Sequence, residues 1–170
     1  MLDTRIAIRP ARLADLPLLA DIERRAAALF PESDLPPALR GAVLPAEALA
    51  GAQLDGLLWV AEDEGRVAGF ALAEIVDGHL HLAEMDVDPD HARRGLGAAL
   101  LRRLVVEAAM RGHAALTLTT FAHLPWNAPF YRRHGFQDFA PDADSQLAAR
   151  LRAEAAAGFR NRVALRRVID

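Results

Sequence analysis

Two arginines and two glycines, Arg93, Arg94, Gly95 and Gly97, stand where an apolar stretch ends and a run rich in alanine and leucine begins. The first turn of a helix carries backbone N–H groups without intrahelical partners at the positive end of the helix dipole, so an anion there collects several hydrogen bonds. Glycine permits close approach to the backbone, and arginine adds charge-assisted hydrogen bonds. The junction predicts a phosphate-binding turn, and the alternative is an ordinary strand-to-helix turn with solvated arginines.

The spacing of this turn narrows the choice of phosphate ligand. Leu100 stands where a dinucleotide-binding fingerprint would place its third glycine or alanine. A Walker-type loop requires a lysine after its last glycine, and all 20 basic residues of this chain are arginine. The pattern therefore disfavours a Rossmann site and excludes a P-loop nucleotide hydrolase.

A second motif, Pro125 to Phe136, follows the strand-like stretch Leu116 to Thr120 and reads Pro-Trp-Asn-Ala-Pro-Phe-Tyr-Arg-Arg-His-Gly-Phe. In this order, the segment from Arg93 to Ala98 and the Tyr-x-x-x-Gly-Phe ending resemble the two cofactor-binding segments of the GNAT family, the GCN5-related N-acetyltransferases. The resemblance extends from a first strand at Ile6 to a last one near Arg167.

Two positions depart from the family pattern. Ala92 stands three residues before the first motif glycine, where the family usually has glutamine or arginine. Asn127 lies four residues before Tyr131, whereas many family members place an asparagine seven residues before the tyrosine. We interpret the Pro-Trp-Asn-x-Pro-Phe-Tyr form as a branch of the family, with Arg93 and Arg94 compensating for Ala92.

The resemblance implies a mixed α/β fold with a central, mostly antiparallel sheet of about six to seven strands, splayed in the middle and covered by helices on both faces. It also implies acetyl-CoA as co-substrate and transfer of an acetyl group to an amine. The expected cofactor contacts are Met85, Asp86, Val87, Arg93, Arg94, Gly95, Leu96, Gly97, Ala98, Asn127, Phe130 and Tyr131.

The strand before the phosphate-binding turn changes the parity of its apolar residues. Leu80 and Leu82 share one parity, and Met85 and Val87 share the other. A strand whose buried face changes parity needs one extra residue, so we expect a β-bulge between Leu82 and Met85. In the GNAT resemblance, the pantetheine arm pairs with the backbone around Met85 and Val87, and a backbone N–H near Val87 meets the oxyanion.

Two residues are candidates for proton transfer. Glu84 lies at the expected bulge in an otherwise apolar strand, where burial would raise its pKa and suit it to accept a proton from the amine. A solvated or salt-bridged glutamate is the alternative. Tyr131 is the only tyrosine of the chain and matches the family tyrosine that protonates the thiolate; a structural core aromatic is its alternative. For Asn127, binding pantetheine and capping the following helix both remain open.

Composition fits one domain over residues 1–170, with 52% hydrophobic and 25% charged residues. The absence of cysteine excludes disulfides and thiolate metal sites, and we expect no metal. No apolar run approaches the roughly 20 residues of a membrane span, and a net charge of -3 gives no footprint for nucleic acid or membrane lipid. We therefore expect a cytoplasmic protein and leave a homodimer open.

Strand and helix patterns alternate along the chain. The expected elements are a strand at 5–9, a helix at 15–29, a proline-rich loop at 31–45 with one short helix, a helix at 46–52, a hairpin of 57–61 with 67–75, and a last strand at 163–167. We expect His79 and His81 to form a polar strand face rather than a metal site. The arginines from Arg160 to Arg167 are expected on a solvated strand face rather than in a nucleic-acid patch.

These observations favour an N-acetyltransferase that moves the acetyl group of acetyl-CoA to a primary amine of a small molecule, by direct attack in a ternary complex. Protein N-termini or lysines are alternative acceptors, and a non-catalytic acyl-CoA-binding or regulatory domain is the alternative class. Glu32 and Asp34 in the proline-rich loop either favour a cationic amine or merely solubilise the loop.

Overall fold

The computed structural model describes residues 5–170 and contains one seven-stranded sheet with the strand order β1-β2-β3-β4-β5-β7-β6. The strands are β1 (Ile6–Pro10), β2 (Leu58–Asp63), β3 (Arg66–Val76), β4 (His79–Val87), β5 (Ala115–Phe121), β6 (Gln137–Asp138) and β7 (Arg162–Val168). The helices are α1 (Leu16–Ala27), α2 (Pro37–Arg40), α3 (Ala46–Leu54), α4 (Leu96–Met110), α5 (Ala128–Arg133) and α6 (Gln146–Ala156), with short 3-10 turns at Leu13–Asp15 and Pro89–His91. The mixed, mostly antiparallel sheet expected from the sequence is confirmed.

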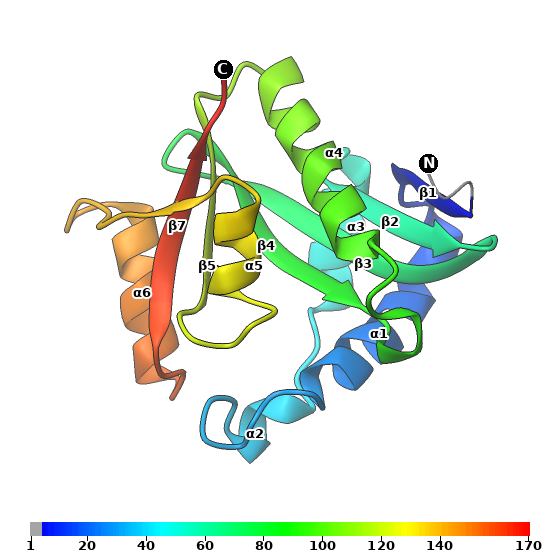
Figure 1. The fold of residues 1–170 in the computed structure, drawn as a ribbon, viewed down its shortest axis with the longest axis horizontal. Coiled ribbons are helices and arrows are strands. Elements are labelled where there is room, and N and C mark those ends of the chain that lie inside the picture. The colour runs from blue at the N-terminus through cyan, green and yellow to red at the C-terminus, as the bar shows by residue number, and fades with distance from the viewer. Residues whose placement is uncertain (1–4) are drawn as a thin grey trace.

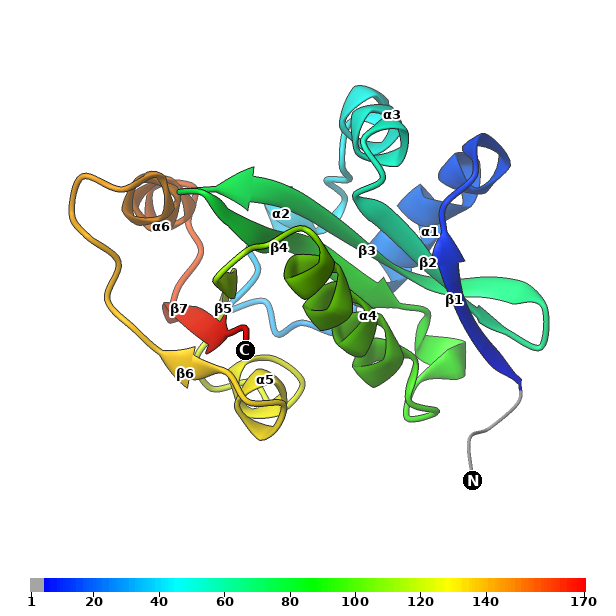
Figure 2. The ribbon, with the colours of Figure 1, turned by 90° about the horizontal axis from the view of Figure 1, so that it is seen from above.

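Helices cover both faces of the sheet (Figures 1 and 2). On one face lie α4 and α5, and the largest apolar cluster packs there around Leu100 and Leu104 of α4. On the other face, α1 and α3 bury a second cluster, with Leu19 and Phe70 among its members, and α6 packs on the β7 end. No helix within residues 5–170 has both the length and the apolarity to cross a membrane.

Tight turns join the three antiparallel strands that precede the site. Glu64 and Gly65 connect β2 to β3, and Asp77 and Gly78 connect β3 to β4. All four residues have positive φ, between 52° and 79°, which is the geometry of the type I′ turns that match the twist of a hairpin. The expected hairpin about residues 63–66 is confirmed.

The sheet is split between its two parallel strands. β4 and β5 pair only where Leu80, His81 and Leu82 face Leu116, Thr117 and Leu118. Beyond Leu82, β4 continues to Val87 without a partner on its β5 side. A gap therefore opens between β4 and β5 toward their C-terminal ends, as the family resemblance implied.

The expected bulge lies at Ala83. Leu72 of β3 pairs with Glu84, whereas its neighbour Ala73 pairs with Leu82, so Ala83 is the extra residue of β4. Leu82 and Met85 consequently both contribute to the apolar cluster under α4. Since side chains alternate along a strand, the bulge turns the Glu84 side chain toward the α1 face of the sheet.

The interpretation of His81 as part of a polar strand face is wrong. Its side chain is 1% exposed, and its Nδ1 atom lies 2.9 Å from Oγ1 of Thr117 across the β4–β5 pair. Burial lowers the pKa of His81 to about 3, so the ring is neutral and stabilises the last paired rungs before the strands separate.

Candidate active site

A cavity of about 370 Å³ lies where β4 and β5 separate. Its walls come from β4, β5, α1, α5, the start of β7 and the segment between α1 and α3. Five residues expected at the site line it together, namely Glu84, Met85, Asp86, Asn127 and Tyr131. The fold thus brings the two sequence motifs to one cavity at the split in the sheet.

Three carboxyl groups meet in this cavity, and we call them the carboxyl cluster: Glu23, Glu84 and Asp86. Glu84 and Asp86 pair with Leu72 and Phe70 of β3, whose side chains belong to the apolar cluster under α1. Glu23 reaches them from α1, and one carboxylate oxygen from each residue lies within 4.8 Å of the others. Sequence reasoning missed Glu23, although its position beside Leu19 and Ile22 on the apolar face of α1 was a usable signal.

Burial holds protons on this cluster. It raises the pKa of Glu23 to about 7, assisted by the charge of Glu84 and opposed by the Leu44 N–H, which donates to Oε2 of Glu23 at 2.9 Å. Burial also raises the pKa of Glu84, and its neighbours Asp86 and Arg162 offset part of that rise. The pKa of Asp86 is raised well above its ordinary value, by burial first and by Glu84 next. Carboxyl groups tuned in this way can exchange protons near neutral pH.

Tyr131 approaches the same cavity from the opposite face of the sheet. It lies on α5, is 7% exposed, and packs its ring edge-on against Phe130 and Phe136. Burial and the charges of Glu84 and Asp86 raise the pKa of its hydroxyl, so the group keeps its proton at neutral pH. The hydroxyl is thus placed as a proton donor, with the carboxyl groups as acceptors across the cavity.

Asn127 occupies the position before α5, but its side chain does not cap the helix. Its Nδ2 atom makes one long hydrogen bond of 3.4 Å to the carbonyl of Trp126, and its Oδ1 atom is buried without a partner among the described residues. A buried oxygen without a partner is costly unless a ligand N–H reaches it. The capping alternative is therefore not observed, and Oδ1 is available to an amide of a bound ligand.

The predicted phosphate-binding turn leads directly into α4. Gly95 has a φ of 89°, in the left-handed region that glycine tolerates, and precedes the 15 residues of α4. The Leu96 side chain is 1% exposed in the core, so this residue offers a ligand only its backbone. A Cβ atom on Gly97 would lie 3.8 Å from the Phe130 ring and 3.9 Å from Met85, so these side chains border the approach to the turn.

Asp63 anchors this turn, and sequence reasoning did not identify it. The side chain of Asp63, at the end of β2, is 4% exposed and accepts hydrogen bonds from Arg94 at 2.8 Å and from Nδ1 of His91 at 2.7 Å. The hydrogen bond from His91, together with the hydrogen bond and charge of Arg94, lowers the pKa of Asp63. Arg94 is therefore held beside β2, whereas the exposed Arg93 has a φ of 62° and belongs to the turn itself.

Aromatic rings border the cavity on the side away from the turn. Phe30 and Phe121 have ring centroids 5.4 Å apart, and Trp126 meets Phe30 edge-on at 5.9 Å. Asp34, expected in the sequence as a substrate-facing or solubilising residue, is instead 5% exposed and pairs with His123 at 3.1 Å. Neither Glu32 nor Asp34 lines the cavity. The acidic residues in its lining are those of the carboxyl cluster.

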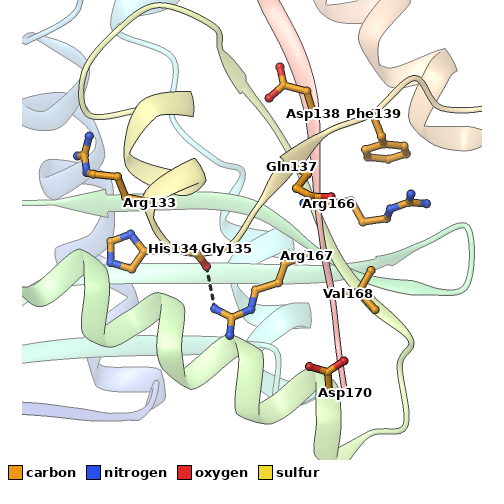
Figure 3. A pocket seen from close by; sticks show the side chains of 10 residues that line it. All are labelled: Arg133, His134, Gly135, Gln137, Asp138, Phe139, Arg166, Arg167, Val168 and Asp170. Atoms are coloured by element: carbon orange, nitrogen blue, oxygen red, sulfur yellow. Dashed lines mark hydrogen bonds between the residues drawn. The ribbon is translucent and has the colours of Figure 1, made fainter.

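A larger hollow of about 560 Å³ lies elsewhere, at the outer edge of the sheet (Figure 3). Its lining includes none of the expected site residues. Two of its arginines already have partners, since Arg167 donates to the His134 carbonyl at 2.8 Å and Arg166 stacks 4.8 Å from the Phe139 ring centroid. The expected last strand is β7, on which Arg166 is exposed as predicted, whereas Arg162 and Arg167 are only partly exposed. The smaller cavity is the better candidate site.

Comparison with protein families agrees with this geometry. Residues 55–138 match the model of the acetyltransferase (GNAT) domain, which spans β2 to β6 and includes both motifs. The chain belongs to the GNAT family. The GNAT match includes Glu84 and Tyr131, whereas Glu23 and the segment that borders the cavity lie outside it.

Curated proteins similar to this GNAT chain include two acetyltransferases. Mycothiol acetyltransferase of Clavibacter sepedonicus is 37% identical over 92 residues, 54% of this chain and 30% of that protein. The [ribosomal protein bS18]-alanine N-acetyltransferase of Escherichia coli K12 is 38% identical over 74 residues, 44% of this chain and 50% of that protein. This chain thus spans half or less of the length of these relatives.

Solved structures match over nearly the whole chain. The ribosomal-protein-S18-alanine N-acetyltransferase from Escherichia coli superposes with a TM-score of 0.69 and 26% identity, covering 97% of this chain and 94% of that one. An N-acetyltransferase from Thermoplasma acidophilum, solved with coenzyme A, gives a TM-score of 0.70 at 16% identity, covering 96% and 98%. The latter likeness establishes the shared fold.

Proposed function

We propose that this protein is an acetyl-CoA-dependent N-acetyltransferase acting on a primary amine of a small molecule. One observation carries the proposal: the Glu84 carboxyl and the Tyr131 hydroxyl line the same cavity, and they reach it from opposite faces of a sheet that is split at that point. Their placement suits a reaction that removes a proton from one side of a bound thioester and delivers one to the other side.

The residues around the cavity fit the co-substrate. The Arg93–Ala98 segment offers backbone N–H groups and the positive end of the α4 dipole to a pyrophosphate. The Asn127 Oδ1 atom needs an N–H donor, which a pantetheine amide supplies. The backbone of Met85, Asp86 and Val87 has no strand partner toward β5 and can pair with the same arm. Acetyl-CoA supplies the activated acetyl group.

In the proposed reaction, Glu84 accepts a proton from the acceptor ammonium, directly or through water, and so frees the lone pair of the nitrogen. A backbone N–H near Val87 stabilises the oxyanion as the nitrogen bonds to the thioester carbon. The C–S bond then breaks, Tyr131 donates its proton to the departing thiolate, and the second proton that the nitrogen loses on becoming an amide restores the tyrosine hydroxyl. The amine becomes an amide and the thioester becomes a thiol, so the reaction requires neither an oxidant nor a metal ion.

Similar proteins support N-acetyl transfer with coenzyme A as the carrier. The ribosomal protein relative acetylates an alanine amine, and the Thermoplasma neighbour holds coenzyme A. For this chain we further expect one domain, activity without added metal, and work in the cytoplasm, where acetyl-CoA is available.

The test is release of CoA thiol from acetyl-CoA in the presence of a panel of primary amines, with mass spectrometry of the acetylated product. Thiol release that depends on the amine and persists with EDTA supports the proposal. Binding of acetyl-CoA without acetylation of any amine would instead favour the non-catalytic acyl-CoA-binding class.

A further inference from the structure

We infer that the acceptor is a small cationic amine on an apolar body, without a carboxylate group near the nitrogen. This inference rests on the proposed function and concerns the same cavity, since it assigns the chemistry of the second substrate.

The floor of the cavity is acidic. The carboxyl cluster places three acidic side chains within 4.8 Å of one another, measured between one oxygen of each. The Asp86 Oδ2 atom is buried and has no hydrogen-bond partner among the described residues. A buried carboxylate oxygen in this state requires a donor, and an ammonium group supplies up to three. An ammonium ion among the three carboxyl groups favours their ionised forms, so the floor suits the charged form of an amine before Glu84 deprotonates it.

Arg162 lines the cavity but is not free to bind a substrate carboxylate. Its Nε atom lies 3.1 Å from Oε2 of Glu154, and its guanidinium also donates to Oγ1 of Thr119 at 3.3 Å. Its planar group stacks 4.6 Å from the Phe121 ring centroid and 5.4 Å from that of Phe159. An amino acid bound here would find its carboxylate beside the carboxyl cluster with no unpaired cation to offset the repulsion.

The remaining wall is apolar. Phe30, Phe121 and Phe159 line the cavity together with aliphatic side chains of the segment between α1 and α3, which are Leu35, Leu39, Val43 and Leu44. Phe121 and Phe159 already stack with Arg162, so this wall suits the hydrocarbon part of an amine rather than its charged end. An apolar body gains from burial here, whereas a highly polar one would lose its water without replacement.

Contacts between two loops favour a small acceptor over a peptide. The segment after α1 and the loop after β5 meet through the Phe30–Trp126 edge contact at 5.9 Å and the Asp34–His123 pair at 3.1 Å. Phe30 and Asn127 of these two segments line the cavity, so the contacts tie two of its walls together. An extended peptide would need space between these walls, and a compact amine would not.

The test compares matched acceptors in the thiol-release assay. Phenethylamine, L-phenylalanine and L-phenylalaninamide share one aromatic body. L-phenylalanine adds a carboxylate next to the amine, and L-phenylalaninamide replaces that carboxylate by an uncharged amide. We expect kcat/KM for phenethylamine to exceed that for phenylalanine by about a hundredfold, because like charges a few ångströms apart repel strongly, and phenylalaninamide to recover most of the loss. Equal rates for the three compounds, or faster acetylation of a peptide N-terminus than of phenethylamine, would overturn the inference.

A variant separates the acceptor preference from the chemistry. In an assay at pH 8, where Glu23 is ionised, Glu23→Gln removes one charge from the cluster while keeping an oxygen that accepts from Leu44, so it should narrow the ratio of kcat/KM for phenethylamine to that for phenylalanine by about tenfold. Glu47→Gln, at an exposed position on α3, is the matched control and should leave the ratio unchanged. An unchanged ratio in Glu23→Gln would contradict the inference. Failure to acetylate any of these amines, peptide included, would contradict the proposed function itself.

Discussion

The guanidinium of Arg94 lies 2.8 Å from the buried carboxylate of Asp63, which ties the phosphate-binding turn to the end of a strand 31 residues earlier in the chain. His91 shares the same Asp63 oxygen at 2.7 Å. The turn before α4 is thereby held from β2 as well as by its own strand. We interpret Asp63 as a positioning residue for the turn, which would touch no part of acetyl-CoA itself.

Replacing Asp63 by asparagine should weaken acetyl-CoA binding by about tenfold, since Arg94 loses its charged partner, His91 loses a carboxylate acceptor, and the turn is less constrained. Isothermal titration calorimetry measures the change. Glu64→Gln, which affects an exposed ion pair in the adjacent hairpin turn, serves as control and should bind like the wild type. Equal acetyl-CoA affinity of Asp63→Asn and Glu64→Gln would show that Asp63 does not position the turn.

Tyr131→Phe should lower kcat by roughly a hundredfold or more, the range typical of a lost general acid, and leave the Kd of acetyl-CoA within about twofold. The ring packing against Phe130 and Phe136 does not need the hydroxyl, so the fold should be preserved. Steady-state kinetics and calorimetry on the same preparation provide the two numbers. A variant with normal kcat would show that the thiolate takes its proton from elsewhere.

Glu84→Gln should lower kcat/KM by roughly 10²- to 10⁴-fold, as expected for a lost general base. In the wild type, Glu84 must be deprotonated to act, and its raised pKa places the acidic limb of the pH profile above the range of an ordinary glutamate. The acidic limb of the pH profile should disappear in Glu84→Gln, except for the part that arises from deprotonation of the amine substrate. Retention of the complete limb in Glu84→Gln would assign the base to another group.

Glu23→Gln should stabilise the protein at pH 8 and not at pH 5. The pKa of Glu23 is raised to about 7 in the folded state, so folding favours its proton, and the stability this provides is lost as the pH rises from the unfolded value through 7. Glutamine does not ionise, so at pH 8 the free energy of unfolding of the variant should exceed that of the wild type by about 1 kcal/mol, after allowance for the partial exposure of Glu23 to solvent. Thermal melts at the two pH values measure the difference. A gain of equal size at both would point to a cause other than ionisation.

Local patterns predicted much of the fold. The bulge at Ala83 was predicted because Leu82 and Met85 would point to opposite faces of a regular strand. Both can be buried on the same face only if the strand contains one extra residue between them. The hairpin followed from the glycine at 65, and the turn before α4 from Gly95. Each of these features depends on residues that are close in sequence.

Features that depend on distant segments were missed. Glu23 joins Glu84 only because α1 packs across β4, and Asp63 meets Arg94 only because β2 ends beside the turn. The burial of His81 likewise depends on Thr117 of β5, which is 36 residues later in the chain. Periodicity in one segment contains no information on such pairings, so the sequence predicted the candidate acid and base but not their charged neighbours.

The most direct test of the account is calorimetric titration of acetyl-CoA into the wild type, Gly95→Glu and Gly112→Glu. Both glycines have positive φ and open space around them, at opposite ends of α4, so the two variants introduce the same charge and similar backbone strain. We predict that acetyl-CoA binds the wild type and Gly112→Glu and that binding is lost in Gly95→Glu, since only there does a carboxylate enter the proposed phosphate site. Equal binding by both variants, or no binding to the wild type, would contradict the account.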